Sequence, residues 1–203
     1  VAAAHRASWV EVVMAALAAY LHRVTGEETV VLGVPLMGRP GSVFSRVPGT
    51  WVNVVPIDVA AGPEVSRQEL MRRIRARLDE VRGHRDYRFE DMRRDLRGAG
   101  DDRPPSRVWI NVKPFDIPLR FGEAQGSSRY LAAGPVEELT VSVYPRHGDD
   151  ELYFEFDGNP SMYSRRELAA HRERFLDFLD RFAAAPPERP VGGLDTVTAA
   201  QRD

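Results

Sequence analysis

The chain has 203 residues, of which 43% are hydrophobic, so it can form one domain with a buried core or one lobe of a larger domain. Its formal net charge of −2 provides no overall attraction to nucleic acid or to an anionic membrane. The absence of cysteine excludes disulfides, thiol catalysis and thiolate metal sites, and it fits a cytoplasmic protein.

The first quarter of the chain predicts a core helix, a buried strand and a long loop. Residues 8–24 are apolar nearly all round, which is typical of a buried helix, and Gly26 is a suitable C-cap. The apolar part of this helix is too short to span a membrane. Residues 29–36 form an apolar, β-branched run that predicts a buried strand. Residues 37–50 are rich in Gly, Pro and Ser, so we expect a loop.

A second strand and two helices are predicted next. Residues 51–59 have strand character, and Pro56 indicates that the strand ends or lies at a sheet edge there. Ser66-Arg-Gln-Glu69 has the pattern of a capping box and opens a helix. A short helix is expected over residues 88–97. In the helix opened by Ser66, the apolar residues of the core face follow one another at intervals of four, four and three residues: Leu70, Ile74, Leu78 and Val81.

The second half of the chain predicts a strand, a hairpin and a final helix. Residues 107–113 form the strand, and the irregular segment that follows contains a candidate short strand at 119–121. Apolar and polar residues alternate over 139–144 and 152–157, which is typical of a hairpin. A second capping box, Ser164-Arg-Arg-Glu167, opens a helix whose apolar face is Leu168, Phe175, Phe178, Leu179 and Phe182. Together these elements predict an α/β fold, a two-layer sandwich of helices on a mixed sheet.

Common catalytic motifs are missing from the sequence. It has no glycine-rich phosphate or dinucleotide loop, no nucleophile elbow and no histidine spacing suited to a metal. Arginines alternate with acidic residues over 67–97, which is typical of an exposed helix face whose charges compensate one another rather than of a nucleic-acid site. Residue patterns alone therefore predict a soluble α/β lobe with no metal site.

Three motifs give a more specific indication, because they occur in the order and spacing of a known family. They are Gly38-Arg39 after the first strand, Gly49-Thr-Trp-Val-Asn53 at the start of the second, and His84-Arg-Asp-Tyr-Arg-Phe-Glu90 before the short helix. Here Trp51 replaces the Phe of the family's second motif, and Arg85 and Arg88 replace Gln and Pro in its third. The chain resembles the C-terminal half of a non-ribosomal peptide synthetase condensation domain.

The resemblance implies a fold similar to chloramphenicol acetyltransferase, with two lobes and an active-site tunnel between them. The family forms an amide bond between a carrier-bound acyl or peptidyl thioester and a carrier-bound aminoacyl acceptor. Its catalytic HHxxxDG motif belongs to the N-terminal half, and no histidine here is followed four residues later by aspartate. We therefore expect no catalytic residue in this chain and no activity from it alone. One tunnel wall should remain as an exposed apolar surface.

The resemblance also implies roles for individual residues. Arg39 either supports the catalytic loop by pairing with the Asp of the HHxxxDG motif or forms a salt bridge within this lobe. Gly49, Trp51 and Asn53 are candidates for lining the tunnel, and Asn53 alternatively caps a strand end. In the third motif, His84 and Asp86 look like a catalytic pair, but we expect a structural helix-entry turn that includes Glu90, with Tyr87 and Phe89 in the core.

The resemblance finally implies an arrangement of domains and partners. Residues 1–185 would be the C-terminal lobe, with a floor loop over 39–50 and a latch to the other lobe within 111–138. Residues 186–203 resemble a linker towards an adenylation domain. Expected partners are the N-terminal lobe, donor and acceptor peptidyl carrier proteins with their phosphopantetheine arms, and the adenylation domain, with no cofactor bound directly, no nucleic acid and no membrane. The amino-acid sequences around the motifs are most similar to those of condensation domains in siderophore synthetases. The alternative is a non-catalytic docking domain for carrier proteins or tailoring enzymes.

Overall fold

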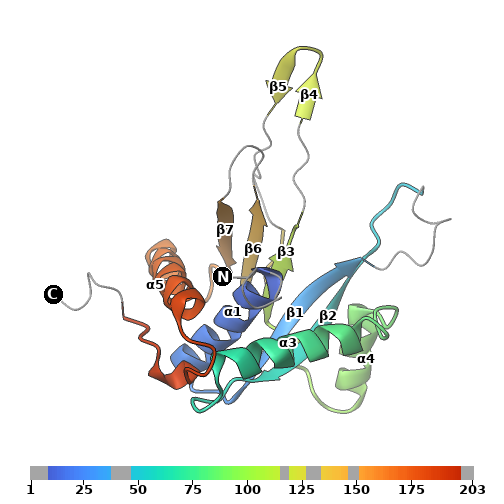
Figure 1. Ribbon diagram of the computed structural model, residues 1–203. Helices are drawn as coiled ribbons and strands as arrows, with labels where there is room; N and C mark the ends of the chain where they lie inside the picture. The colour runs from blue at the N-terminus through green and yellow to red at the C-terminus, as the bar shows by residue number, and fades with distance from the viewer. Residues whose placement is uncertain (1–8, 38–46, 115–118, 127–133, 146–150, 198–203) are drawn as a thin grey trace.

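A five-stranded mixed sheet covered by helices on one face organises the molecule (Figure 1). The structure, a computed structural model, describes residues 9–37, 47–114, 119–126, 134–145 and 151–197. The strand order is β2-β1-β3-β6-β7. The two-layer α/β sandwich predicted from the sequence is confirmed.

Five strands build the sheet from two antiparallel pairs that flank a parallel centre. β1 (Thr29–Met37) pairs antiparallel with β2 (Val52–Ala60) and parallel with β3 (Val108–Val112). β6 (Leu139–Pro145) runs parallel to β3 and antiparallel to β7 (Leu152–Gly158). Side chains alternate between the faces along each strand, so every second residue points away from the helices.

Within the described residues, four α-helices accompany the sheet. α1 (Trp9–Thr25) lies between α3 (Arg67–Val81) and α5 (Arg165–Ala184), and contacts both. This central position explains why α1 is apolar all round, since its residues from Val12 to His22 are all buried. The shorter α4 (Phe89–Gly98) follows α3 and has no buried residue.

Aromatic residues of α5 hold the helical layer to the sheet. Phe175, Phe178 and Phe182 are fully buried, as the spacing of the predicted apolar face required. The Phe175 ring centre lies 5.7 Å from that of Tyr20 on α1 and 5.9 Å from that of Phe154 on β7. One side chain therefore joins α1, α5 and the edge of the sheet.

The helix ends follow the sequence signals with one difference. Gly26 has φ 79° and donates its N–H to the His22 carbonyl at 2.8 Å, which makes it the expected C-cap of α1. Ser164 forms both hydrogen bonds of its capping box. Ser66 accepts a hydrogen bond from the Glu69 N–H, but the Glu69 carboxylate binds two arginines of α3 instead of completing the box.

Pro56 lies within an edge strand. β2 continues through this residue to Ala60, and β2 has a partner strand on one side only among the described strands. Of the two alternatives for Pro56, a strand end or a sheet edge, the edge position is therefore confirmed. On the outer side of an edge strand no partner strand needs the N–H that proline lacks.

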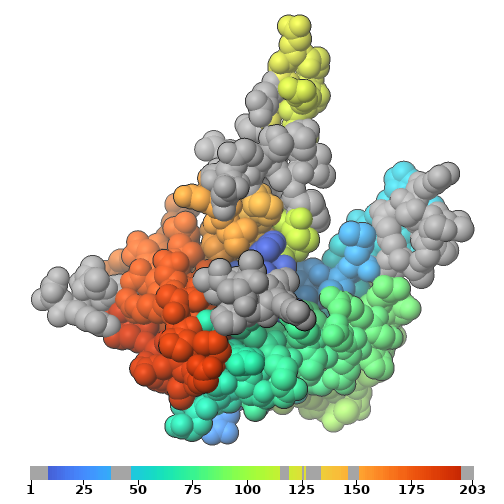
Figure 2. Space-filling model, in the orientation of Figure 1, coloured from blue at the N-terminus to red at the C-terminus, as the bar shows by residue number. Residues whose placement is uncertain are grey.

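A second, two-stranded sheet stands away from the first. β4 (Leu119–Phe121) coincides with the short strand predicted from the sequence, and it pairs with β5 (Ala124–Gly126), which was not predicted. The hairpin rises clear of the main sheet and helices (Figures 1 and 2), and Phe121 is 70% exposed. A two-stranded hairpin of this size is marginal in water without a surface to pack against.

The chain after α5 packs on the lobe instead of leaving it. The N–H groups of Arg67 and Gln68 donate to the carbonyls of Arg189 and Pro187, both at 2.9 Å. In the short 3₁₀ helix η2 (Val191–Gly193), Val191 is fully buried. Residues 186–197 are thus part of this folded unit, and Figure 2 shows the red segment beside the start of α3. The sequence had suggested a linker from residue 186. That the chain continues to an adenylation domain stays a prediction.

Candidate functional site

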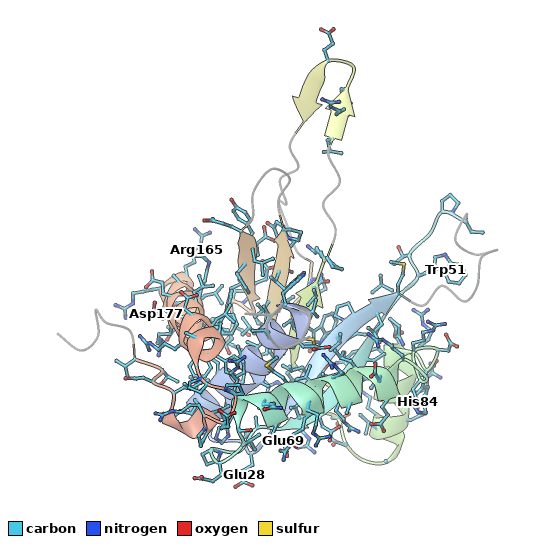
Figure 3. All side chains as sticks on the ribbon, viewed as in Figure 1. Glu28, Trp51, Glu69, His84, Arg165 and Asp177 are labelled. Carbon is cyan, nitrogen blue, oxygen red and sulfur yellow. The ribbon has the colours of Figure 1, made fainter. Side chains whose placement is uncertain are left out.

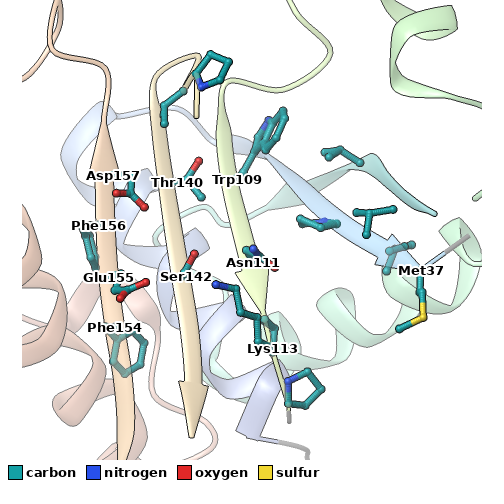
Figure 4. A pocket seen from close by; sticks show the side chains of 18 of the residues that line it. Met37, Trp109, Asn111, Lys113, Thr140, Ser142, Phe154, Glu155, Phe156 and Asp157 are labelled. Carbon is teal, nitrogen blue, oxygen red and sulfur yellow. The ribbon is translucent and has the colours of Figure 1, made fainter. Parts of the chain in front are cut away.

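The sheet face that α1, α3 and α5 leave uncovered carries a groove of about 910 Å³ (Figure 4). All five strands of the main sheet contribute side chains to its lining. A volume of this size is typical of small-molecule sites in proteins, about 300–1,000 Å³. The groove is therefore the candidate site.

Strand register arranges the groove side chains in rows across the sheet. Trp109 on β3 pairs with Thr140 on β6, which pairs with Asp157 on β7. In the next row Asn111 pairs with Ser142, and Ser142 pairs with Glu155. These side chains share the uncovered face, as the labels in Figure 4 show.

The β1–β2 side of the groove is apolar. Met37 pairs with Val52, and Pro35 pairs with Val54, and all four side chains line the groove. Met37 is 64% exposed and Val52 is 49% exposed. The predicted exposed apolar surface is thus present on this side, whereas β6 and β7 add hydroxyl and carboxylate groups to the lining of the groove.

The β6–β7 side is polar and partly charged. The Tyr144 hydroxyl donates a 2.7 Å hydrogen bond to the Glu155 carboxylate, and the Lys113 ammonium lies 5.4 Å from the centre of the Tyr144 ring. Burial, and then the neighbouring Glu155 carboxylate, raise the pKa of Asp157, while Lys113 acts in the opposite direction.

Close contact between Trp109 and Gly33 fixes the centre of the groove. A methyl group on Gly33 would lie only 2.5 Å from Trp109 Cδ1, so glycine allows the indole to lie against β1. The Phe89 ring also meets the indole in an edge-to-face arrangement, with 5.6 Å between the ring centres. Trp109 therefore links the third sequence motif to the groove.

Asn53 joins the second sequence motif to the third. Its amide nitrogen donates to the carbonyls of Arg85 and Tyr87, each at 2.8 Å. Its amide oxygen accepts from the Phe89 N–H at 3.0 Å, and the residue is 7% exposed. Asn53 points away from the groove, whereas its neighbours Val52 and Val54 line it.

The other residues predicted for the tunnel lie apart from the groove. Gly49 lies beside Trp51, since a methyl group on Gly49 would be 3.2 Å from Trp51 Nε1, and neither residue lines the groove. Figure 3 shows Trp51 and His84 on the side of the lobe opposite to α5. Arg39 falls outside the described residues.

The third motif forms a turn between α3 and α4. His84, Asp86 and Glu90 are exposed, and the Tyr87 N–H donates to the His84 carbonyl at 3.1 Å. Tyr87 was expected in the core but is 46% exposed, because its hydroxyl reaches Asp95 on the surface of α4. Phe89 is half-buried against Trp109.

Sequence reasoning missed the polar side of the groove. Thr140 and Ser142, and likewise Glu155 and Asp157, are the polar members of the alternating pattern that identified the hairpin. Alternation places them on the face opposite the core, but it cannot show that this face is concave. The described residues contain no group of three or more His, Asp or Glu able to hold a metal, and no helix long and apolar enough to cross a membrane.

Comparisons with known proteins give the family. The family model of the condensation domain matches residues 1–203. The chain is 36% identical over 196 residues to a dimodular nonribosomal peptide synthase of Bacillus subtilis (strain 168), covering 97% of this chain and 8% of that protein. It is 39% identical over 192 residues to an isonitrile lipopeptide synthase of Streptomyces coeruleorubidus, covering 95% of this chain and 13% of that protein.

Solved structures agree with the sequence matches. The first condensation domain of the CDA synthetase has a TM-score of 0.85 and 34% identity, covering 97% of this chain and 44% of that chain. The starter condensation domain of rhizomide synthetase RzmA has a TM-score of 0.82 and 34% identity, covering 93% of this chain and 45% of that chain. The chain thus spans less than half of each solved domain. The chain belongs to the condensation-domain family of non-ribosomal peptide synthetases.

Proposed function

We propose that this chain is the C-terminal half of a condensation domain that joins a carrier-bound acyl or peptidyl thioester to a carrier-bound aminoacyl amine. Amide-bond formation is the general function of the family. The observation that carries the proposal is the uncovered sheet face with its groove, on a chain that matches 44% of a solved condensation domain. The remaining half would cover this face and supply the HHxxxDG motif.

The groove is suited to be one wall of the tunnel between the two halves. Its apolar side, at Met37 and Val52, would contact the phosphopantetheine arm or the partner half, since exposed apolar side chains of this kind favour covered surfaces. Catalysis would come mainly from holding thioester and amine together, which contributes about 7–11 kcal/mol at ideal geometry. No cofactor is needed in the lobe itself, because the carrier proteins bring the phosphopantetheine.

The β4–β5 hairpin would serve as the latch to the other half. It falls within the segment 111–138 proposed for this role, and it presents Phe121 to solvent. Packing against the partner half would give this short hairpin the support that it lacks here.

Asn53 would act by positioning. Its three hydrogen bonds to the backbone of the turn favour this role over contact with substrate. The exposed turn residues His84, Asp86 and Glu90 would be structural, and Arg39 would support the catalytic loop.

The subgroup is proposed as siderophore-like. Vanchrobactin synthetase VabF of Vibrio anguillarum is 32% identical over 95% of this chain, and enterobactin synthase component F of Escherichia coli (strain K12) is 31% identical over 87% of it. These relatives support the expectation drawn from the motifs. The following domain would then be an adenylation domain, and the protein would be cytoplasmic.

The test compares the chain of residues 1–203 with a longer protein that also contains the N-terminal half. Donor and acceptor carrier proteins are loaded with substrates, and the amide product is measured by mass spectrometry. We expect product from the longer protein and none above background from the chain alone. In the longer protein, replacing the second histidine of HHxxxDG by alanine should remove the product.

Two results would contradict the proposal. Product from residues 1–203 alone, at the rate of the longer protein, would place the catalytic groups in this chain. A longer protein that binds loaded carrier proteins but forms no amide would replace the proposal with the docking-domain alternative.

A further inference from the structure

We propose that the β6–β7 side of the groove binds a protonated amino group on the side chain of a carrier-bound substrate, so that the preferred substrate carries a second amine. This inference rests on the proposed function and specifies the substrate class of the same groove. It follows from the carboxylates of Asp157 and Glu155, their hydroxyl neighbours, and the cavity that all of them line.

The two carboxylates face the groove from one edge of the sheet. Glu155 and Asp157 are two residues apart on β7, so they share a face, and both are partly buried. Their cross-strand partners Ser142 and Thr140 also line the groove and add hydroxyl oxygens that can accept hydrogen bonds. An ammonium group has three donors, and this set offers it carboxylate and hydroxyl acceptors together.

Burial and the neighbouring charges both act on the carboxylate of Asp157. Burial, and then the like charge of Glu155, raise the pKa of Asp157, because together they disfavour its ionised form by more than Lys113 favours it. Lys113 also lines the groove and acts against this shift, and its ammonium lies 5.4 Å from the centre of the Tyr144 ring. Arg172, which also lines the groove, directs its Nε to the Phe154 carbonyl at 3.4 Å. A cation from a ligand would therefore be favoured beside Asp157.

The reacting amine is a poor candidate for this position. An amine must be neutral to attack a thioester, whereas a neighbouring carboxylate favours the protonated form and raises the amine pKa. Asp157 and Glu155 would therefore inhibit the reaction if they bound the nucleophile. They suit an amino group that stays charged, which places it elsewhere in the substrate.

Trp109 gives the rest of such a substrate a surface. It occupies the same row as Asp157, two strands away, and strands are spaced by about 4.8 Å, so the two backbones are about 10 Å apart. A substrate can therefore rest its alkyl portion towards the indole while its amino group reaches the carboxylates. The apolar lining of β1 and β2 continues on the far side of Trp109.

The experiment uses the longer protein with both halves and a pair of matched substrates. Pantetheine thioester mimics with a stable amide linkage carry either ornithine or norvaline, which differ only by the terminal amine. Calorimetry measures binding of each mimic, and competition between carrier proteins loaded with the two amino acids measures condensation. We expect a preference for ornithine of about tenfold or more, as for other charge-assisted hydrogen bonds.

Variants of similar shape identify the groups responsible. Asp157→Asn should reduce the preference to about twofold or less, and Glu155→Gln should reduce it in part, because each removes one carboxylate. Glu173→Gln removes an exposed carboxylate of α5 that does not line the groove and should leave the preference unchanged. Circular dichroism checks that each variant is folded.

The outcomes separate this inference from the proposed function. Equal binding and equal condensation of the two substrates would overturn the inference and leave condensation intact. A binding preference that Asp157→Asn abolishes, without amide product, would support the inference and contradict the proposed function. A preference that survives both carboxylate variants would overturn the assignment to Asp157 and Glu155.

Discussion

Replacing Asn53 by alanine should destabilise the fold, because the Asn53 side-chain amide joins β2 to the turn after α3 through three hydrogen bonds. The substitution leaves the carbonyls of Arg85 and Tyr87 and the N–H of Phe89 without this partner. Each neutral hydrogen bond contributes about 0.5–1.5 kcal/mol net. Three of them give an expected loss of about 3 kcal/mol in the free energy of unfolding.

The burial of Asn53 favours the upper part of the range of about 0.5–1.5 kcal/mol for each hydrogen bond. The residue is 7% exposed, so water can replace the amide only after the turn moves. Asn53→Asp is a more stringent test of these hydrogen bonds. Aspartate keeps the acceptor for the Phe89 N–H but places a negative charge opposite the carbonyl oxygens of Arg85 and Tyr87. We expect it to be at least as destabilising as Asn53→Ala.

Urea denaturation of the chain, followed by circular dichroism, measures both variants. Asn159→Ala is the matched control, since the Asn159 amide also makes backbone hydrogen bonds, but at exposed positions. We expect the control to cost less than about 1 kcal/mol. A loss below about 1 kcal/mol for Asn53→Ala would refute the argument that this amide holds the turn, and would return Asn53 to the list of substrate contacts.

Four further changes test other parts of the structure. Gly33→Ala should cost about 1–3 kcal/mol and alter tryptophan fluorescence, since its methyl group would meet Trp109 at 2.5 Å. Phe175→Ala, a fully buried site, should cost about 3–5 kcal/mol in urea denaturation. Gly192→Ala should speed limited proteolysis of the segment after α5, because the added methyl would lie 2.8 Å from the Pro63 carbonyl oxygen. Arginine hydrogen bonds lower the pKa of Glu69 from 4.5 to about 2, so its contribution to stability is complete above the unfolded pKa and is lost as the pH falls towards 2. Glu69→Gln should flatten the pH dependence of stability in this range, by less than about 1 kcal/mol because the pair is partly exposed.

Local patterns were sufficient to predict most elements of the fold, although not β5. The phenylalanine spacing of α5 and the alternation in β6 and β7 reflect the periods of helix and strand, which depend on neighbouring residues alone. The same holds for Gly26, whose positive φ ends α1. Pro56 marked an edge strand, because an absent N–H is tolerated only where no partner strand needs it.

The candidate site was harder to predict, because it depends on which strands become neighbours. Trp109 and Asp157 are far apart in the sequence and meet in one row only through β6. Asn53 was identified from its motif, but its side chain turns to the helix side of β2, and only the position of the turn after α3 shows why. The packing of residues 186–197 depends largely on hydrogen bonds that backbone groups make with distant parts of the chain, and local side-chain patterns do not reveal these partners.

This packing fixes the position and direction of the chain as far as Val197. A flexible segment as long as residues 186–197 would let its end wander over distances of about 20 Å. Here Gly192 donates to the Pro63 carbonyl, and Arg181 holds the carbonyls of Asp195 and Val197, both at 2.9 Å. A domain attached beyond Val197 would therefore start from a fixed origin and direction on this lobe.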